Sequence, residues 1–263
     1  MTRIAIHGAG GRMGRRLVAL THEDEKLTLA GAIEHDKHDA LGTDAGILAG
    51  VGKTDVALGT SLPSDVDVVI DFALPIATPK IIEACVASKT ALVIGTTGLT
   101  PELHAQIDEA GKSIAILQAP NMSLGVNLLF ALAAQVAKQL GDDYDIEITE
   151  AHHRFKRDAP SGTAMGIAQA ICNATGKDID KDLVHGRHGD DVQRKRGEIG
   201  MHALRVGSEV GRHSAFFANL GEELELTHKA FNRDVFVHGA LKAAKWLAGK
   251  PAGRYGMADV LGL

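Results

Sequence analysis

The feature that most constrains the fold is a glycine-rich turn near the N-terminus. A short apolar segment, 3–7, leads into Gly8, Gly11 and Gly14, and a helical pattern then runs through Leu20. Glycine at these positions allows a tight turn, close approach of a pyrophosphate to the backbone, and close packing of the helix on the strand. The segment therefore predicts the strand, turn and helix of a dinucleotide-binding fold.

An acidic residue after the second predicted strand bears on the choice of cofactor. The strand covers 27–33 and ends at Glu34, twenty residues after the last glycine of the turn. A carboxylate there accepts hydrogen bonds from the adenosine ribose and repels a 2′-phosphate. The neighbouring residues Arg12, His35 and Lys37 could each help to bind that phosphate instead. We expect NADH to be preferred and NADPH to be tolerated.

Alternating strand and helix patterns extend this first domain. Strands are predicted over 66–72, 91–94 and 113–117, with helices over 75–88 and 100–111. The alternation predicts an α/β fold with a Rossmann-like, doubly wound parallel sheet, whose ligands bind beyond the carboxyl ends of the strands. The loops at those ends provide candidate cofactor contacts: Phe72, Gly95, Thr96, Thr97, Ala119, Pro120, Asn121 and Met122.

The pattern changes after residue 123. An apolar helix over 124–140 is expected to lie buried between layers. Beyond it, few helices separate the predicted strands, which are 144–150, 197–206, 212–219 and 222–227. This is typical of an α+β domain with a mixed or antiparallel sheet. The segments 36–63 and 178–196 lack a clear period and are expected to be loops, the first with a short strand near Val56.

An amphipathic helix over 234–247 is expected to return to the first domain. We therefore predict a discontinuous dinucleotide-binding domain, 1–123 plus 233–263. The second domain, 124–232, would bind the substrate and form oligomers.

The stretch EAHHRFKRDAPSGTA, residues 150–164, carries the most chemistry. It combines adjacent histidines, His152 and His153, with three cationic side chains. Pro160 prevents a helix at the residue before it, and Ser161 is suited to cap a helix that follows. The first amides of such a helix would bind a carboxylate or phosphate. Zinc is disfavoured, because adjacent strand residues point to opposite faces and no H-E-x-x-H motif or Cys/His cluster occurs.

Composition excludes several other classes of protein. The net charge of −5 over 263 residues disfavours generic nucleic-acid binding. Cys85 and Cys172 fall within helical patterns and are expected to be core residues. The longest apolar run, 128–134, is too short to span a bilayer, and no signal peptide precedes the first strand. We expect a cytoplasmic protein without a membrane partner.

Three strings beside the glycine turn carry a family resemblance: GTTG at 95–98, APNM at 119–122, and E-A-H-H-x-x-K-x-D-A-P-S-G-T-A at 150–164. With them the sequence resembles the 4-hydroxy-tetrahydrodipicolinate reductase family, formerly called dihydrodipicolinate reductase, of the bacterial and plant diaminopimelate and lysine pathway. The resemblance extends from the first strand to the terminal helix. It implies NAD(P)H-dependent reduction of 4-hydroxy-tetrahydrodipicolinate, with loss of water, to tetrahydrodipicolinate.

The resemblance also implies roles for individual residues. His152 matches the acid-base residue and Lys156 the proton donor, while the substrate would contact His153, Ser161, Gly162 and Thr163. The cofactor would contact the turn residues Gly8, Ala9, Gly10, Gly11, Arg12 and Met13, then Glu34, and the loop residues named above. Arg233 matches a position near the hinge between domains. The family's usual homotetramer assembles through the sheets of the second domain.

Two alternative hypotheses, which assign the chain to other classes of protein, remain open. A nucleotide-sensing regulator would explain the first domain, but it leaves His152 and Lys156 without a task. A reductase or dehydrogenase acting on another small acid, such as an aspartate dehydrogenase or a semialdehyde enzyme, would share the architecture. A semialdehyde dehydrogenase requires a nucleophilic cysteine, for which Cys172 is a poor candidate.

Overall fold

The computed structural model describes residues 1–263, which divide into two compact units. Unit 1 comprises Met1–Ser123 and Asp234–Leu263, and unit 2 comprises Leu124–Arg233. Each unit has a sheet, covering helices and a hydrophobic core of its own.

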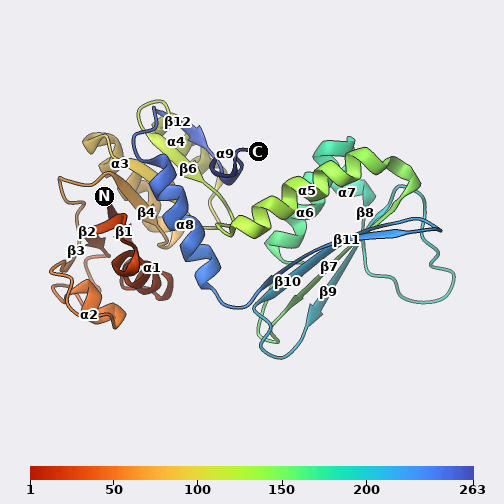
Figure 1. The fold of residues 1–263 in the computed structure, drawn as a ribbon, viewed down its shortest axis with the longest axis horizontal. Helices are drawn as coiled ribbons and strands as arrows, with labels where there is room; N and C mark the ends of the chain where they lie inside the picture. The colour runs from red at the N-terminus through yellow and green to blue at the C-terminus, as the bar shows by residue number, and fades with distance from the viewer. The chain divides into compact units, whose positions relative to one another are not determined.

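Unit 1 is built on a seven-stranded sheet in the order β12-β6-β5-β4-β1-β2-β3 (Figure 1). All of its strand pairs are parallel. The strands are β1 (Thr2–His7), β2 (Leu27–Ile33), β3 (Leu58–Gly59), β4 (Val68–Asp71), β5 (Ala91–Ile94), β6 (Ala115–Gln118) and β12 (Gly253–Tyr255). The helices are α1 (Arg12–Glu23), α2 (Ala45–Ala49), η1 (Pro75–Ala77), α3 (Thr78–Ser88), α4 (Pro101–Ala110), α8 (Asp234–Leu247) and α9 (Met257–Leu261).

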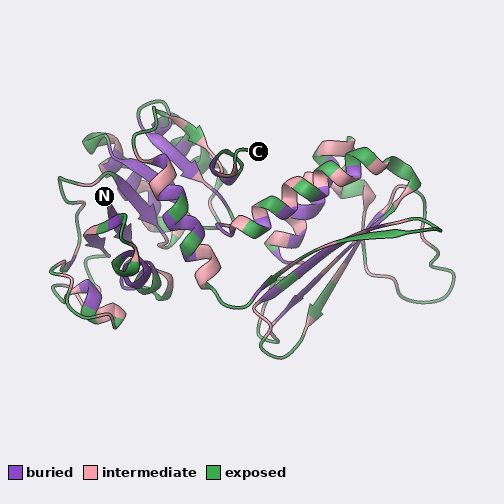
Figure 2. Cartoon of the chain, in the orientation of Figure 1, coloured by how far each residue is buried: buried purple, intermediate pink, exposed green.

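The central strands of this sheet are buried along most of their length (Figure 2). Parallel sheets covered on both faces need such continuous apolar strands, and the β4 sequence VVID and the β5 sequence ALVI supply them. The predicted Rossmann-like parallel sheet is confirmed.

Unit 2 contains a five-stranded mixed sheet in the order β11-β10-β7-β9-β8. The pairs of β7 with β10 and of β10 with β11 are antiparallel, whereas β7 with β9 and β9 with β8 are parallel. The strands are β7 (Asp145–His152), β8 (Leu183–His185), β9 (Ile199–Arg205), β10 (Gly211–Ala218) and β11 (Glu223–Ala230). The helices are α5 (Leu124–Leu140), η2 (Gly141–Asp143), α6 (Gly162–Thr175) and α7 (Ile179–Asp182). The predicted α+β architecture with a mixed sheet is confirmed.

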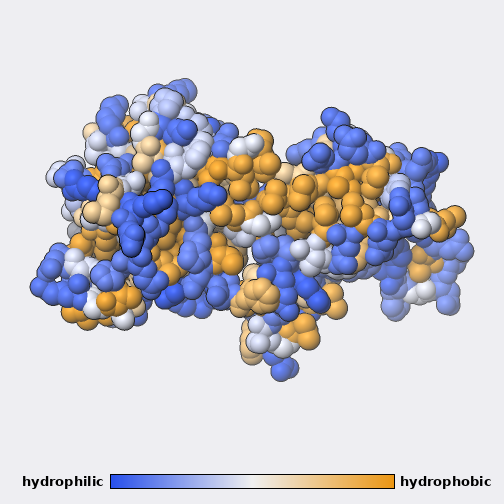
Figure 3. Space-filling view, viewed as in Figure 1, coloured by the Kyte–Doolittle hydropathy of each residue, from blue (hydrophilic) through white to orange (hydrophobic).

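The prediction that helix α5 is buried between layers is wrong. It packs on α6 and the sheet on one side only, so Leu128 and Leu132 stay 42% and 38% exposed. Figure 3 shows apolar surface over this helix. By length and composition alone, the segment Leu124–Asp143 could cross a membrane. A helix that packs one side against the core of a protein meets the same criteria.

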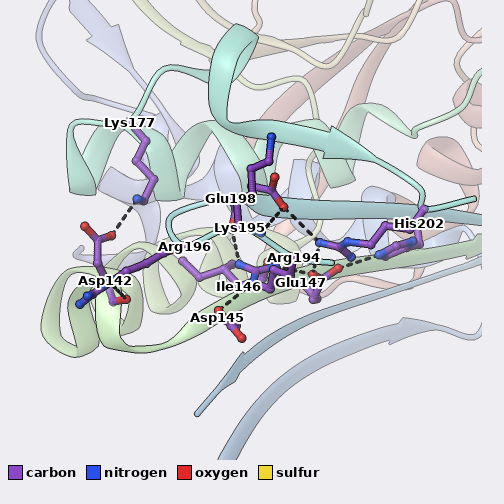
Figure 4. A network of polar contacts seen from close by, with 11 residues as sticks. Asp142, Asp145, Ile146, Glu147, Lys177, Arg194, Lys195, Arg196, Glu198 and His202 are labelled. Carbon is purple, nitrogen blue, oxygen red and sulfur yellow. Dashed lines mark hydrogen bonds and ion pairs between the residues drawn. The ribbon is translucent and has the colours of Figure 1, made fainter. Parts of the chain in front are cut away.

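The segment 178–196 is more ordered than a loop, since it contains α7 and β8. Arg194 anchors the part that follows β8: its side chain pairs with Glu147 and Asp145 and donates to the carbonyl oxygens of Ile146 and Glu198 (Figure 4). Ion pairs among residues far apart in the chain give no local pattern. The sequence therefore could not reveal this anchorage.

Candidate active site

The glycine turn of unit 1 has the geometry that its spacing predicts. Gly8 has a φ of +80°, and a Cβ there would lie 2.8 Å from the Phe72 carbonyl oxygen. A Cβ on Gly14 would overlap the Gly8 carbonyl oxygen. Both positions thus require glycine: a side chain at residue 8 would meet the backbone that follows β4, and one at residue 14 would separate α1 from the end of β1.

The start of α1 is open to an anion. Its N-cap residue, Gly11, provides no side-chain acceptor, and the first turn contains no acidic residue. The leading amides and the helix dipole therefore favour a negatively charged group. A cavity of about 1310 Å³ lies beside this helix start and is lined by Gly8, Gly11, Arg12, Met13, Glu34 and Phe72, among others. These residues fit the pyrophosphate and adenosine of a dinucleotide.

The carboxylate of Glu34 is held at the edge of the turn. Its Oε2 accepts a hydrogen bond from the Gly10 amide at 3.1 Å, and its Oε1 accepts one from the His35 amide at 3.1 Å. Glu34, Arg12 and His35 all line the cavity, whereas Lys37 does not. This part of the cavity thus contains two carboxylates, Glu34 and Asp36, and the side chains of Arg12, His35 and His38, which are able to bind a phosphate.

The other predicted cofactor residues lie outside this cavity. Gly95, Thr96 and Thr97 follow β5, and 119–122 follow β6, both at carboxyl ends of strands. A Cβ on Gly95 would overlap the Phe72 ring, which itself lines the cavity. The Thr96 hydroxyl points inward and donates to Asp71 Oδ2 at 2.9 Å.

The loop after β6 uses its side chains internally. Asn121 Oδ1 accepts a hydrogen bond from the Ser123 amide at 2.8 Å, and Met122 is 2% exposed. Ala119 is also buried. Arg233 lies exposed at the end of unit 2.

In unit 2, the buried carboxylate of Glu150 organises the end of β7. Its Oε2 lies 2.6 Å from His152 Nδ1 and accepts from Arg205 at 2.8 Å. Its Oε1 accepts from the Ser161 amide at 3.0 Å and from a second Arg205 nitrogen at 2.9 Å. One carboxylate therefore joins β7, β9 and the start of α6.

The protonation states of this cluster follow from its contacts. Burial raises the pKa of Glu150, but the hydrogen bonds from Arg205 and His152 outweigh it and hold the pKa below its usual value. Burial lowers the pKa of His152 despite the opposing effect of Glu150. Glu150 is thus ionised, His152 Nδ1 donates to it, and the ring is neutral near pH 7.

The second ring nitrogen of His152 is the one left for a substrate. A Cβ on Gly211 would lie only 3.1 Å from His152 Nε2, so glycine at this position leaves that nitrogen uncovered. The side chain of His152 is 11% exposed. The tautomer imposed by Glu150 makes Nε2 a hydrogen-bond acceptor.

Lys156 is a positively charged residue that follows His152 closely in the sequence. Its Nζ pairs with Asp158 Oδ1 at 2.8 Å, and its amide donates to the His153 carbonyl oxygen at 3.1 Å. The Lys156 charge also contributes to the lowered pKa of His152, after burial. The two catalytic candidates thus interact electrostatically within unit 2.

The predicted helix start is present at α6, with Ser161 as its N-cap. The Ser161 hydroxyl accepts from the Ala164 amide at 3.2 Å and contacts His213 Nε2 at 3.0 Å. Because Ser161 is 2% exposed, its side chain supports the helix start and does not face a ligand. Gly162 is open: no atom lies within 4 Å of the position of a Cβ there.

Three members of this cluster, Glu150, Arg205 and His213, were not predicted as site residues from the sequence. Of these, only Glu150 lies in the stretch 150–164. Arg205 and His213 lie on β9 and β10, far along the chain, and only sheet pairing brings them to β7. The ring centroids of His213 and His152 are 5.1 Å apart. No spacing rule links these positions, so no sequence signal could have found Arg205 or His213.

The fold and the cluster together define a class of protein. Unit 1 has a Rossmann-like sheet with a glycine turn before α1, and unit 2 contains a histidine, a lysine and the start of α6. These features are typical of a nicotinamide-dependent oxidoreductase.

Comparison with known proteins identifies the family within this class. The family model "Dihydrodipicolinate reductase, N-terminus" matches residues 2–122, and "Dihydrodipicolinate reductase, C-terminus" matches residues 125–261. The chain therefore belongs to the dihydrodipicolinate reductase family, and it is an oxidoreductase of diaminopimelate and lysine biosynthesis. Because the chain belongs to this family, the alternative hypotheses of a nucleotide-sensing regulator and of a semialdehyde enzyme are no longer supported.

Individual relatives agree with that membership over the full chain. The 4-hydroxy-tetrahydrodipicolinate reductase of Syntrophotalea carbinolica is 46% identical over 266 residues, covering 100% of both chains. That of Alkalilimnicola ehrlichii is 48% identical, covering 100% of this chain and 99% of its own. The dipicolinate-bound dihydrodipicolinate reductase from Paenisporosarcina sp. TG-14 shares the fold, with a TM-score of 0.78 at 24% identity over 98% of this chain and 99% of that one.

Proposed function

We propose that this protein reduces 4-hydroxy-tetrahydrodipicolinate, with loss of water, to tetrahydrodipicolinate, using a nicotinamide cofactor. The cofactor supplies a hydride to C4 of the conjugated imine formed when the 4-hydroxyl leaves as water. The observation that carries the proposal is the Glu150, His152 and Lys156 cluster beside the open start of α6. The choice of substrate in this proposal rests on the family to which the chain belongs.

Lys156 is the proton donor in this proposal. Hydride addition leaves an enamine, which needs a proton, and electron density accumulates on the ring during transfer. An ammonium group stabilises that density and can deliver the proton. His152 is neutral near pH 7, so it accepts a hydrogen bond through Nε2 and positions the substrate or the proton donor.

The substrate carboxylates are assigned to the start of α6. The amides of Gly162 and Thr163 lead a helix of fourteen residues, whose dipole favours a negative charge. His153 adds a side chain whose Nδ1 is buried without a hydrogen-bond partner. Ser161 supports this site from behind through its buried hydroxyl.

The cofactor is proposed to be NADH, with NADPH tolerated. The Glu34 carboxylate supports NADH because it can accept hydrogen bonds from both ribose hydroxyls but repels a 2′-phosphate. Arg12 and His35 line the same cavity and support tolerance of NADPH. Binding across the loops after β5 and β6 would place the nicotinamide at the carboxyl ends of those strands.

A homotetramer in the cytoplasm completes the proposal. The helices α5 and α6 cover one face of the unit 2 sheet. The other face carries Glu147 and His202 together with Leu204, which is 48% exposed. This uncovered face supports assembly through the sheet. Both cysteines are unpaired, which suits a reducing compartment.

The deciding experiment follows cofactor absorbance with substrate made in place from pyruvate and aspartate semialdehyde by the preceding synthase. We expect substrate-dependent oxidation of NADH, with slower oxidation of NADPH measured in parallel. Lys156→Ala should lower kcat by about 10²–10⁴-fold, the usual contribution of a general acid. NADH affinity, measured by fluorescence titration, should not change.

Two matched variants separate proton donation from charge. Lys156→Arg keeps the cation but has no proton to give near pH 7, so it should be nearly as slow as Lys156→Ala. Arg157→Ala removes an exposed cation from the adjacent position and should keep full activity. Unchanged turnover in Lys156→Ala would remove this residue from the mechanism, and no oxidation by the wild type would refute the proposed reaction.

A further inference from the structure

Another histidine–carboxylate pair, His7 and Asp71, lies in unit 1, and neither residue has a role in the proposed reaction. His7 ends β1 and Asp71 ends the neighbouring strand β4, and the two are opposite each other in the register. His7 Nδ1 lies 2.7 Å from Asp71 Oδ1. His7 is 8% exposed and Asp71 is completely buried.

The other contacts of Asp71 identify the atom that carries the proton between them. Its Oδ2 accepts from the hydroxyls of Thr78 at 3.0 Å and Thr96 at 2.9 Å. Its Oδ1 accepts in addition from the Ala73 amide at 3.2 Å. Because Thr78, Thr96 and Ala73 all donate to this carboxyl group, it acts as an acceptor, and the hydrogen of the 2.7 Å contact is placed on His7 Nδ1. The ring is fixed, and its Nε2 is left for another partner.

The position of His7 shows which partner that is. His7 lines the cavity beside Gly8 and Gly11. In the sheet, β1 lies between β2, which leads to Glu34, and β4, which carries Asp71. The bond to Asp71 draws the ring toward β4, away from the adenosine side. A dinucleotide with its pyrophosphate on the turn would therefore pass His7 with its second half.

We propose that His7 Nε2 hydrogen-bonds an oxygen of the bound dinucleotide beyond its adenosine half, at the second phosphate or the ribose joined to it. Asp71 is a positioning residue, because it holds the imidazole in the orientation that this contact needs. A ring already fixed loses little rotational freedom when the ligand binds, so more of the bond strength appears as affinity. The inference rests on the proposed use of a nicotinamide cofactor.

The test uses His7→Asn, with binding measured by isothermal titration. The asparagine amide can occupy the place of Nδ1 and donate to Asp71, but it has no atom at the position of Nε2. The probes are NADH, ADP-ribose and AMP, of which AMP ends at the first phosphate. We expect His7→Asn to weaken NADH and ADP-ribose about fivefold to tenfold, as loss of one hydrogen bond does, and to leave AMP unchanged.

The controls distinguish the possible failures. His22→Asn changes an exposed histidine on α1 and should bind all three probes as the wild type does. Wild-type affinity of His7→Asn for ADP-ribose would overturn the inference, since His7 would then serve only Asp71. Equal weakening of AMP would overturn it too, because the whole turn would be disturbed. If the wild type bound neither NADH nor NADPH, the proposed cofactor use itself would fail.

Discussion

At the scale of single residues, the site depends on buried groups whose charges are set by neighbours from other strands. His213 is the most extreme of these: burial, and then the nearby His152, lower the pKa of His213 to about 3. Its ordinary value is 6.5. An imidazole that stays neutral on β10 next to the Ser161 hydroxyl keeps a second positive charge away from His152 and from the helix start.

This depressed pKa predicts a loss of stability in acid. Below pH 6.5 the unfolded chain takes up a proton at residue 213, whereas the folded chain does not until about pH 3. Stability due to this group is therefore complete above pH 6.5 and falls as the pH drops, by about 1.4 kcal/mol per pH unit. Hydrogen exchange of the β10 amides at pH 7 and pH 5, corrected for intrinsic rates, measures the change in unit 2.

The variant His213→Asn should lack this component. Between pH 7 and pH 5 we expect the wild type to lose about 1–2 kcal/mol more protection than the variant does. His185→Asn removes an exposed histidine from β8 and should keep the wild-type pH dependence. An equal pH dependence in wild type and His213→Asn would show that residue 213 titrates normally in the folded protein.

At the scale of elements, close packing of α8 holds unit 1 together at the end of β6. Helix α8 packs on β4, β5 and β6. A Cβ on Gly239 would overlap the Met122 carbonyl oxygen. The helix can lie this close to the 119–122 loop only because residue 239 has no side chain.

Gly239→Ala should therefore destabilise unit 1, although alanine favours a helix over glycine by about 1 kcal/mol. The methyl group meets backbone that cannot rotate away, so overpacking should cost about 1–3 kcal/mol net. Unfolding can be followed by the fluorescence of Trp246, the single tryptophan, which lies in α8 itself. Lys242→Ala, an exposed change in the same helix, should leave the transition in place. A more stable Gly239→Ala would contradict the close approach.

Sequence patterns predicted the long elements well, for a physical reason. The predicted bounds of α5, at 124–140, and of α8, at 234–247, are those observed. Long apolar periods ended by glycine or proline carry enough local information to fix a helix. The short strands β8 and β12 and the helices α2, α7 and α9 were not predicted, because three to five residues become ordered only through contacts with partners distant in sequence.

The candidate site likewise contains residues that could be predicted from the sequence and residues that could not. The turn glycines, Glu34, His152 and Lys156 stand in recognisable strings, so they could be named from the sequence. Arg205 and His213 could not, because their roles depend on strand register and buried hydrogen bonds. Local spacing identifies the groups proposed to face ligands, while the groups that set their charge and orientation come from the whole sheet.

At the scale of the whole molecule, the chain enters unit 2 once and leaves it once. Its core is made entirely of residues between 124 and 233, including Phe217, Ile148 and Ile167. The uncovered face of the sheet lies in the same segment. Folding and assembly of this unit should thus need no residue from outside it.

We predict that segment 124–233, expressed alone, folds and forms the tetramer that is proposed for the full chain. Its β7 and β10 amides should show hydrogen-exchange protection like that in the intact protein, and light scattering should give the mass of four copies. Leu204→Lys, on the uncovered face, should weaken assembly in both proteins. A folded but monomeric segment beside a tetrameric full chain would show that unit 1 contributes to the interface.

The return of the chain at residue 234 also fixes an order of events on the ribosome. The unit 1 sheet is incomplete until β12 pairs with β6, and α8 reaches β4, β5 and β6 only from residues 234–263. These residues follow unit 2 in the sequence. Unit 2 is therefore fully translated while the unit 1 sheet still lacks an edge strand and a covering helix. The part of unit 1 that precedes unit 2 in the sequence can complete its fold only after unit 2 has been made.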